Sequence, residues 1–193
     1  MKTRNIKNLR IIRILLSNPD GSLTKYGIAK LADCAKSWVI EFLRKLEMQK
    51  LVKNTKVLDF DKLVDLYIEI MPKMKYFEFF VQDSVKFLKQ SKLDYALTTY
   101  GAENFTSHHL FSSRYDIYIK EEDFDKWKTF ILEKGLLGKG NLRLIIAKDN
   151  AIFKEAKEIK GIRIVPMPQL LIDLKREGGV CMEAYNILVK RNV

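Results

Sequence analysis

The sequence has only two cysteines, Cys34 and Cys181, and they lie far apart in its 193 residues. Neither belongs to a Cys-x-x-Cys pair, which argues against a disulfide framework and against a zinc site built from cysteines. Long apolar runs are also missing, because the longest, such as Leu142 to Ala147, fall far short of the roughly 20 residues that cross a bilayer. The first residues, MKTRNIKNLRIIRILLSN, have charges threaded through the apolar positions, unlike an export signal. We therefore expect a cytoplasmic protein without a membrane segment.

Charge is unevenly distributed along the chain. The net charge is +11, and 47% hydrophobic with 31% charged residues is typical of a globular protein with a buried core. Residues 1–58 hold 13 Lys or Arg against 4 Asp or Glu, a net charge of +9, whereas residues 59–193 hold 22 against 20, a net charge of +2. Such asymmetry is expected when one module faces a polyanion, since each phosphate contact releases counterions. A lysine-rich solubility bias is the alternative.

The positive third of the chain predicts three helices and a hairpin. Apolar residues recur at helical spacing over residues 5–17, and Asn-Pro-Asp-Gly then ends that helix. Thr24 is placed to cap a second helix, in which Ile28 and Leu31 are expected to face the core. A third helix and a basic two-strand wing, KNTKVLDF, follow. This order of elements predicts a winged helix-turn-helix over residues 1–58.

The third helix, expected from about Lys36 to Gln49, has two distinct faces. Positions i, i+3, i+4 and i+7 form an apolar stripe that is expected to be buried: Val39, Phe42, Leu43 and Leu46. The opposite face is polar and basic, and it is free to enter a major groove. The residues expected to contact double-stranded DNA, with the lysines on phosphate, are Thr24, Lys25, Lys36, Ser37, Trp38, Glu41, Arg44, Lys45, Lys53 and Lys56.

Individual residues on this face suit different contacts. Arg44 can bind a guanine or a phosphate, and Ser37 a phosphate or a base edge. Glu41 can accept a hydrogen bond from a cytosine amino group, or it can serve to reject wrong sequences. Trp38 leaves two roles open, since it can stack on sugars and base edges or pack onto its own domain.

The run AKSWVIEFLRKLEMQKLV resembles the recognition helix and wing entry of winged-helix transcription regulators. Lys50 stands where such families usually have glycine, so the turn into the wing is expected to differ. The resemblance implies DNA binding. Some winged helices bind only protein, so a protein-binding or ligand-sensing module is the alternative.

The rest of the chain predicts a second domain. Residues 59–74 are expected to form a connecting helix that Pro72 ends. Over residues 75–193, segments typical of strands alternate with segments typical of helices, one of them capped by Asp83. This alternation predicts an α/β domain with a mixed sheet, and so an α+β chain overall. We interpret GLLGKGN, residues 135–141, as a loop between a helix and a strand.

The second domain resembles the carboxy-terminal domain of AbiEi-type antitoxins, the transcription regulators of type IV toxin-antitoxin systems. The resemblance is carried by YALTTYGA, by YDIYI with Asp116, and above all by a Pro-x-Gln-Leu-x-x-Asp-Leu stretch that includes Pro168, Gln169 and Asp173. It implies a winged helix that represses its own operon and a second domain that counteracts a nucleotidyltransferase toxin, without a stable complex being required. From the residues themselves, Gln169 and Asp173 lie on one helical face, where structural anchoring is favoured over ligand contact.

The best candidate for catalysis is Asp116, which follows the small-residue turn of SSRYDIYI. Nucleotidyltransferases hold two metal ions with Asp-x-Asp, but Tyr118 stands in place of the second carboxylate, and one acidic ligand cannot clamp a metal pair. His108 and His109 are adjacent and point in different directions, so they do not readily share a metal. We expect no catalytic residue, metal or cofactor. A nucleotidyltransferase-related enzyme, or a decayed relative of one, remains an alternative.

These observations predict an autorepressing, antitoxin-type transcription regulator. Its expected partners are double-stranded DNA and, functionally, a nucleotidyltransferase toxin. A homodimer is expected as well, since DNA-binding proteins of this kind often occupy two half-sites.

Overall fold

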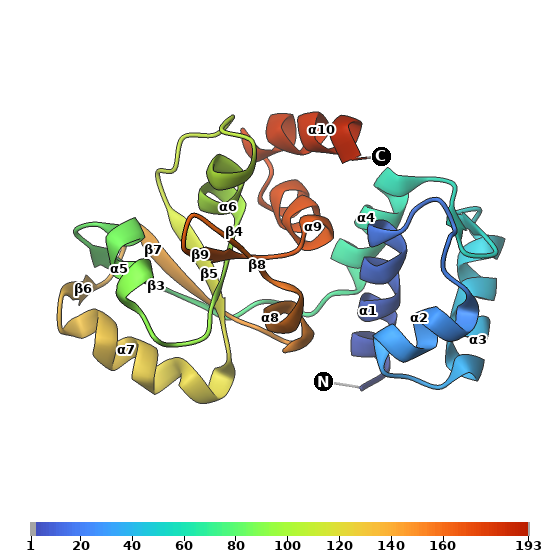
Figure 1. Ribbon diagram of the computed structural model, residues 1–193, viewed down its shortest axis with the longest axis horizontal. Helices are drawn as coiled ribbons and strands as arrows, with labels where there is room; N and C mark the ends of the chain where they lie inside the picture. Colours follow the sequence, from blue (N-terminus) through green and yellow to red (C-terminus); the bar gives the residue numbers. More distant parts are fainter. Residues whose placement is uncertain (1–2, 193) are drawn as a thin grey trace. The chain divides into compact units, whose positions relative to one another are not determined.

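The computed structural model describes residues 3–192, and the side chains of residues 6–191 within that range. The described residues form two compact units, one that ends at Pro72 and one that begins at Lys73. Helices and a mixed sheet make the chain an α+β protein, as the sequence predicts (Figure 1). Among the described residues, no helix combines the length and the apolar character that crossing a bilayer needs.

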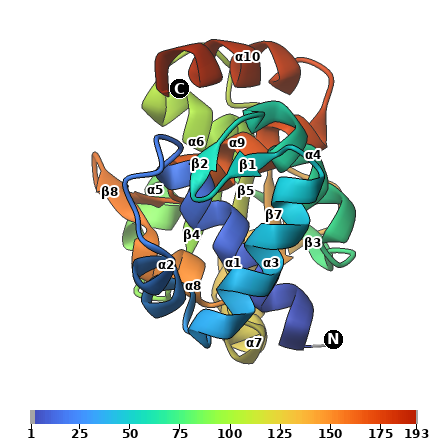
Figure 2. The same ribbon diagram turned by 90° about the vertical axis from the view of Figure 1, so that its right-hand side faces the viewer.

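The first unit consists of helices around a small hairpin. Helix α1 packs against α2 and α4, and α2 packs against α3. Figure 2 shows α3 running toward the hairpin of β1 and β2. The elements are α1 Thr3–Ser17, α2 Lys25–Ala32, α3 Lys36–Met48, β1 Val52–Lys53, β2 Lys56–Val57 and α4 Phe60–Ile70.

The caps of the first unit follow the predicted chemistry, but one core assignment does not. Thr24 caps α2 by accepting a hydrogen bond from the Gly27 backbone N–H at 3.0 Å, which confirms the expected start of that helix. Leu31, expected in the core, is 59% exposed. Each residue turns a helix by about 100°, so the buried stripe of Ile28, Ala29 and Ala32 leaves Leu31 at its margin. The prediction that Leu31 faces the core was therefore wrong.

The segment expected to connect two domains lies within the first unit. Helix α4 covers most of residues 59–74, and Asp59 caps it by accepting a hydrogen bond from the Lys62 backbone N–H at 3.0 Å. Its buried residues Leu63, Val64 and Tyr67 lie on one side, which packs on α1. Helix α4 thus completes the core of the first unit.

The second unit is built on a seven-stranded sheet in the order β6-β3-β7-β5-β4-β9-β8. The pairs β5 with β7 and β4 with β9 are parallel, and the other pairs are antiparallel. The predicted mixed sheet is therefore confirmed. Its strands are β3 Tyr76–Val81, β4 Ala96–Thr98, β5 Tyr115–Ile119, β6 Gly135–Leu137, β7 Leu142–Ile146, β8 Lys157–Ile159 and β9 Ile162–Ile164.

Helices cover both faces of this sheet. On one face the ring of Phe77 in β3 lies 4.4 Å from that of Phe124 in α7, and on the other face Thr98 in β4 bonds to Asp173 in α9. Asp83 caps α5 as expected, since its side chain accepts from the Lys86 backbone N–H at 3.0 Å. The helices are α5 Ser84–Gln90, α6 Thr99–Thr106, α7 Phe124–Leu132 after a 3-10 turn at Glu121–Asp123, α8 Ala151–Glu155, α9 Met167–Glu177 and α10 Cys181–Asn192.

Three short elements were not predicted from the sequence. Residues 135–137, interpreted as part of a loop, form β6, which pairs with β3 at one edge of the sheet. Strand β8 and helix α8 were not expected either. All three have at most five residues, too few to complete a recognisable period.

Candidate nucleic-acid interface

Helix α3 separates an apolar face from a charged one. Val39, Leu43 and Leu46 are buried, which confirms most of the expected stripe, while Phe42 is only half-buried. The side chains of the opposite face are all exposed, and they include the residues expected at DNA: Lys36, Ser37, Glu41, Arg44 and Lys45.

The cations on this face differ in how far they are already paired. Lys45 donates to Glu41 at 2.9 Å across one helical turn, and both side chains are exposed. Such an exposed i,i+4 pair contributes only about 0.3–0.5 kcal/mol, so an anion can displace it. Arg44 makes no ion pair with any residue that the structure describes. Its guanidinium is therefore free to bind an external acceptor.

Trp38 packs onto its own unit. Its indole N–H donates to Asn8 Oδ1 at 3.0 Å, and Lys7 Nζ lies 5.7 Å from the centre of its ring. Because the side chain is half-buried against α1, the packing role, one of the two alternatives that the sequence leaves open, describes this structure.

A tight turn places the start of α3 beside the end of α2. Asp33 adopts a left-handed conformation, with φ of 53°, and Cys34 N donates to Ala29 O at 3.1 Å. Ala35 precedes α3 without a side-chain cap. The N–H groups of Lys36 and Ser37 therefore have no capping side chain, and the positive end of the helix dipole lies beside the exposed Lys36.

A shallow pocket of about 400 Å³ lies at the start of α2. Thr24 already binds the Gly27 N–H, so the N–H groups of Lys25 and Tyr26 in the first turn retain the capacity to bind an anion. Basic and polar side chains from three segments surround this turn, which suits a phosphate group. The pocket is lined by Gly21, Ser22, Leu23, Thr24, Lys25, Tyr26, Lys36, Asn54 and Thr55.

The hairpin places two lysines side by side. Lys53 and Lys56 are directly opposite partners in the β1–β2 register, and both are exposed. Like charges at opposite positions destabilise a strand pair by a few tenths of a kcal/mol, roughly the reverse of an opposite-charge pair. Thr55 anchors the turn between them, since its hydroxyl donates to Gly21 O at 3.1 Å. The two charges are thus held together by the fold, and Glu47 accepts from the Asn54 backbone N–H in the turn between them.

Lys50 lies at the turn from α3 to the hairpin, where the resemblance led us to expect glycine. Its φ is 58°, in the left-handed region, and its N–H donates to Glu47 O at 2.9 Å. Leu51 N donates to Leu46 O at 3.0 Å, which completes a Schellman motif. The turn therefore keeps the backbone that glycine favours, and the lysine side chain adds steric cost to it.

In the second unit, Asp173 joins α9 to the sheet. It is fully buried and accepts hydrogen bonds from Thr98 Oγ1 at 2.6 Å, Tyr118 OH at 2.9 Å and Gln169 Nε2 at 3.1 Å. Arg176 Nη2 lies 3.2 Å away. Burial raises the pKa of Asp173, while Arg176 and the three donors act in the opposite direction. The structural interpretation of Gln169 and Asp173 is the one that this geometry favours.

Asp116 is also fully buried, and both of its oxygens are occupied. Arg114 Nε donates to Oδ1 at 2.7 Å and Arg143 Nε at 2.9 Å, and Thr99 Oγ1 donates to Oδ2. Burial raises the pKa of Asp116, but the hydrogen bonds from the two arginines outweigh it and hold this pKa below its ordinary value. Asp116 thus neutralises two arginines inside the fold.

The arginines extend this contact to α9. Arg114 Nη2 lies 2.6 Å from Glu177 Oε1, and Arg143 Nη2 lies 2.9 Å from Glu177 Oε2. The sequence interpretation missed this group, although Arg114 is two residues before Asp116 and hence on the same face of the strand. Among the described residues, no three His, Cys, Asp or Glu side chains are grouped as metal ligands.

The remaining singled-out residues have structural surroundings. Pro168 is buried in the first turn of α9, a position where proline is tolerated. His108 and His109 are exposed in the loop after α6. Buried Glu103 organises that loop by accepting from the Leu110 N–H at 2.6 Å and from Ser107 Oγ.

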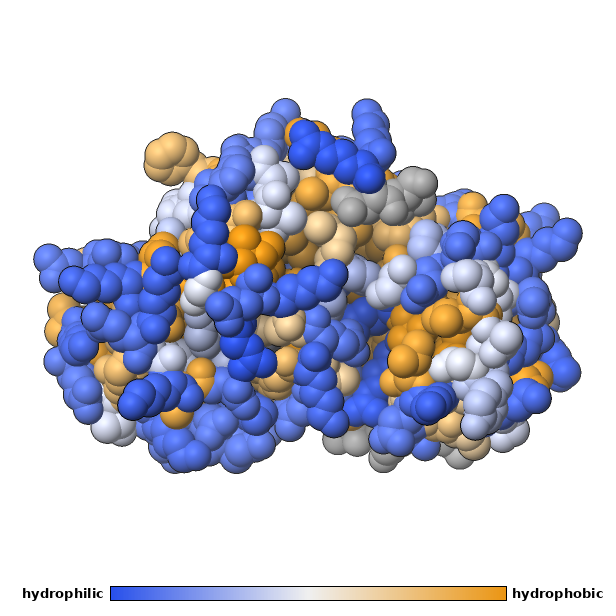
Figure 3. All heavy atoms as spheres, viewed as in Figure 1, coloured by the Kyte–Doolittle hydropathy of each residue, from blue (hydrophilic) through white to orange (hydrophobic). Residues whose placement is uncertain are grey.

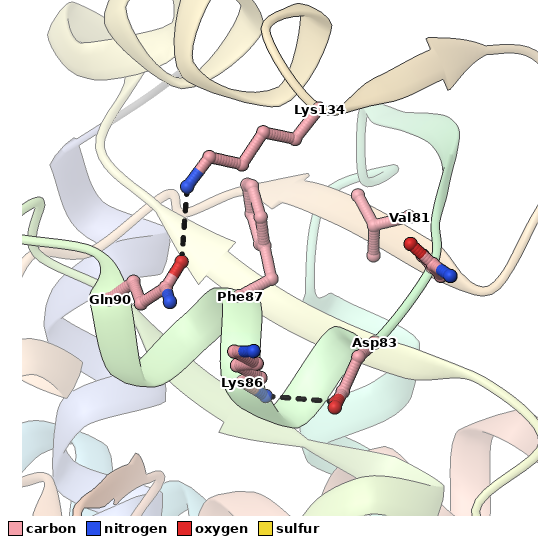
Figure 4. Close-up of a pocket in the computed structure, with 7 residues that line it drawn as sticks. Val81, Asp83, Lys86, Phe87, Gln90 and Lys134 are labelled. Carbon is pink, nitrogen blue, oxygen red and sulfur yellow. Dashed lines mark hydrogen bonds between the residues drawn. The ribbon is translucent and has the colours of Figure 1, made fainter.

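A small polar pocket of about 230 Å³ lies beside α5 in the second unit (Figure 4). Lys134 Nζ donates to Gln90 Oε1 at 3.1 Å across it, and Asp83 holds the Lys86 backbone N–H. Its polar groups are mostly satisfied by one another, and its lysines lie on the surface.

Comparison with known proteins returned no relative. No family model, no curated protein and no solved structure matches this chain. The likeness to AbiEi-type antitoxins consequently rests on the sequence motifs themselves, and the function has to follow from the geometry of the first unit.

Proposed function

We propose that the protein is a DNA-binding transcription regulator whose first unit is a winged helix-turn-helix. Helix α3 is the recognition helix, and the β1–β2 hairpin is the wing. Arg44 and Ser37 contact base edges or phosphates in the major groove, while Lys36 and Lys45 neutralise the backbone.

The observation that carries this proposal is the free cationic face of α3. Its apolar stripe is buried in the first unit, and the opposite side exposes Lys36, Arg44 and Lys45 to solvent. Two exposed carboxylates lie on the same helix, but Glu41 already pairs with Lys45 and Glu47 accepts from the Asn54 backbone N–H at 2.6 Å, so Lys36 and Arg44 make no ion pair among the described residues. An unbalanced cationic helix face suits a polyanion.

The hairpin and the start of α2 support the same partner. Lys53 and Lys56 are opposed across two strands, and Thr24 and Lys25 border the shallow pocket at the start of α2. The hairpin and the start of α2 line one pocket, and their cations would bind phosphate beside the recognition helix and help to fix its register in the groove.

The role of the second unit follows from the resemblance alone. By that likeness, Pro168, Gln169 and Asp173 belong to a domain that counteracts a nucleotidyltransferase toxin, and the first unit represses the shared operon. Growth of cells that express such a toxin, with and without this chain, tests the antitoxin role. Failure to restore growth would remove that role and leave DNA binding to be judged separately.

The test of DNA binding is a titration of labelled duplex, comparing random sequence with the DNA upstream of its own gene, at several salt concentrations. Replacing both Arg44 and Lys45 with alanine should weaken binding by roughly 10- to 100-fold, since a base-contacting arginine is worth about 1–3 kcal/mol. The slope of log affinity against log salt should become shallower by about 2, one for each cation removed.

A matched double variant controls for the general loss of charge. Lys128→Ala with Lys157→Ala removes two exposed cations of the second unit. It should leave both affinity and salt slope near those of the unchanged protein. Equal losses in the two double variants, or an Arg44→Ala/Lys45→Ala protein with unchanged affinity at matched salt, would contradict the assignment of α3 as the recognition helix.

A further inference from the structure

The seven-stranded sheet has two edges of opposite character. Strand β8 at one edge carries Lys157 and Glu158, both exposed, and charges of this kind protect an edge strand from pairing with another chain. Strand β6 at the other edge has the sequence Gly-Leu-Leu and no charge. Its backbone is therefore open to an additional strand.

The orientation of the β6 backbone can be deduced from its pairing with β3. Gly138 N donates to Glu78 O at 3.1 Å, and Leu136 is the partner of Phe80 two residues earlier. Antiparallel pairs alternate, so Leu136 also directs its N–H and C=O toward β3. The N–H and C=O groups of Gly135 and Leu137 consequently point away from the sheet.

Apolar side chains surround this edge on both faces. Leu136 is 68% exposed and Leu137 is 65% exposed, and they point to opposite faces of the sheet. Phe80, the partner of Leu136, is 48% exposed on the same face. Figure 3 shows a largely hydrophilic surface with apolar residues between the charged ones, including at the left rim, the side on which Figure 1 draws β6. Exposed leucines at an uncharged edge are characteristic of an interaction surface.

We propose that β6 pairs antiparallel with β6 of a second copy of this chain, so that the two sheets become continuous across a two-fold axis. The register places Leu136 opposite the partner's Leu136, and Gly135 opposite the partner's Leu137. In this register the outward N–H and C=O groups of Gly135 and Leu137 bond to those of the partner, and Leu136 is a non-hydrogen-bonded pair whose side chains meet closely.

The side chains fit this register. On one face Gly135 lies across from the partner's Leu137, and it carries no side chain because a Cβ there would meet Phe80 O and Ile131 O of its own chain. On the other face the two Leu136 side chains meet and extend to Phe80 of each copy. A large residue thus lies across from the smallest one, and two leucines share the axis.

Charge favours the same arrangement. Glu133 and Lys139 lie at opposite ends of β6, and both are exposed, while Lys134, the other charged residue at these ends, donates to Gln90 Oε1 at 3.1 Å. Residues whose numbers are symmetric about 136 come together, so the register carries the Glu133 end of one strand toward the partner's Lys139 end. Opposite charges then meet at both ends of the interface, a self-complementary pattern that a two-fold interface requires.

The test is sedimentation of the full-length chain over a range of concentrations, without DNA. We expect a reversible monomer–dimer equilibrium. Leu136→Lys should raise the dissociation constant by about tenfold or more, since it places like charges on the axis. Glu158→Lys, at the β8 edge, is the matched control and should leave the dissociation constant unchanged.

Charge exchange tests the register itself. Glu133→Lys and Lys139→Glu should each weaken the dimer, because each brings like charges together, and the two substitutions combined in one chain should restore it. All of these residues are exposed, so thermal unfolding of each variant should match that of the unchanged protein. A chain that stays monomeric at every concentration overturns the proposal, as does a dimer that Leu136→Lys does not weaken or that the combined exchange does not restore. Neither result depends on DNA binding, so the two proposals fail independently.

Discussion

In the first unit Arg44 and Lys36 stand in solvent without an ion-pair partner among the described residues, whereas in the second unit Arg114 and Arg143 are paired with buried Asp116. The same residue type therefore serves two purposes. An exposed cation contributes little to folding and is available to a ligand, while a buried one must be neutralised inside the fold. The excess of positive charge is concentrated in residues 1–58, with a net charge of +9 against +2 for residues 59–193.

The largest effect is expected from substitution of Asp116. Asp116→Ala would leave Arg114 and Arg143 partly buried with Glu177 as the remaining acid between them. Removing one partner of a buried ion pair costs about 3–5 kcal/mol, because the remaining charge is uncompensated. We expect the free energy of unfolding in urea to fall by that order, through the second unit.

Asp94 supplies the control, since it also accepts hydrogen bonds from two cations. Lys120 Nζ lies 2.7 Å and Arg163 Nη1 2.6 Å from its carboxylate, but its side chain is 45% exposed. Solvent screens such a pair, so Asp94→Ala should cost no more than about 1 kcal/mol. Similar losses in the two variants would contradict the view that burial sets the value of these contacts.

Acid should weaken the buried ion pairs of the second unit. The pKa values of Asp116 and Glu177 are both lowered from their ordinary values of 3.8 and 4.5, because hydrogen bonds from the arginines outweigh the effect of burial. A lowered folded-state pKa gives stability that is present above the ordinary pKa and is lost as pH falls through the folded-state value. The free energy of unfolding should therefore decrease as the pH falls below about 4.

Asp173 contributes in the opposite direction, since burial raises its pKa and acid favours its folded form. Urea titrations of the unchanged protein and of Asp116→Asn at several pH values between about 5 and 3 separate these effects. The variant should be less stable at pH 5 and lose less on acidification. A variant with the full acid dependence of the unchanged protein would show that Asp116 is not its source.

Patterns within single segments predicted many of the helices and strands, whereas the contacts between distant segments could not be predicted from the sequence. The caps at Thr24 and Asp83 and the buried stripe of α3 follow from spacing within one helix, so the sequence contains them. Arg143 and Asp116 are 27 residues apart in the chain, and they make contact only because β5 and β7 are neighbours in the sheet. Strand β6 is similar, since three residues gain a strand identity only from pairing with β3.

The smallest expected effect concerns Lys50, which lies in the turn between α3 and the β1–β2 hairpin. Glycine tolerates a φ of 58° without the steric cost that a side chain brings, roughly 1 kcal/mol. Lys50→Gly should therefore raise the free energy of unfolding by about that amount while removing one exposed charge. Lys50→Ala removes the same charge but keeps the Cβ atom, so it should give no such gain. If thermal unfolding shows both variants equally stabilised, charge rather than backbone conformation limits this turn, and the exposed cations of the first unit carry a folding cost of their own.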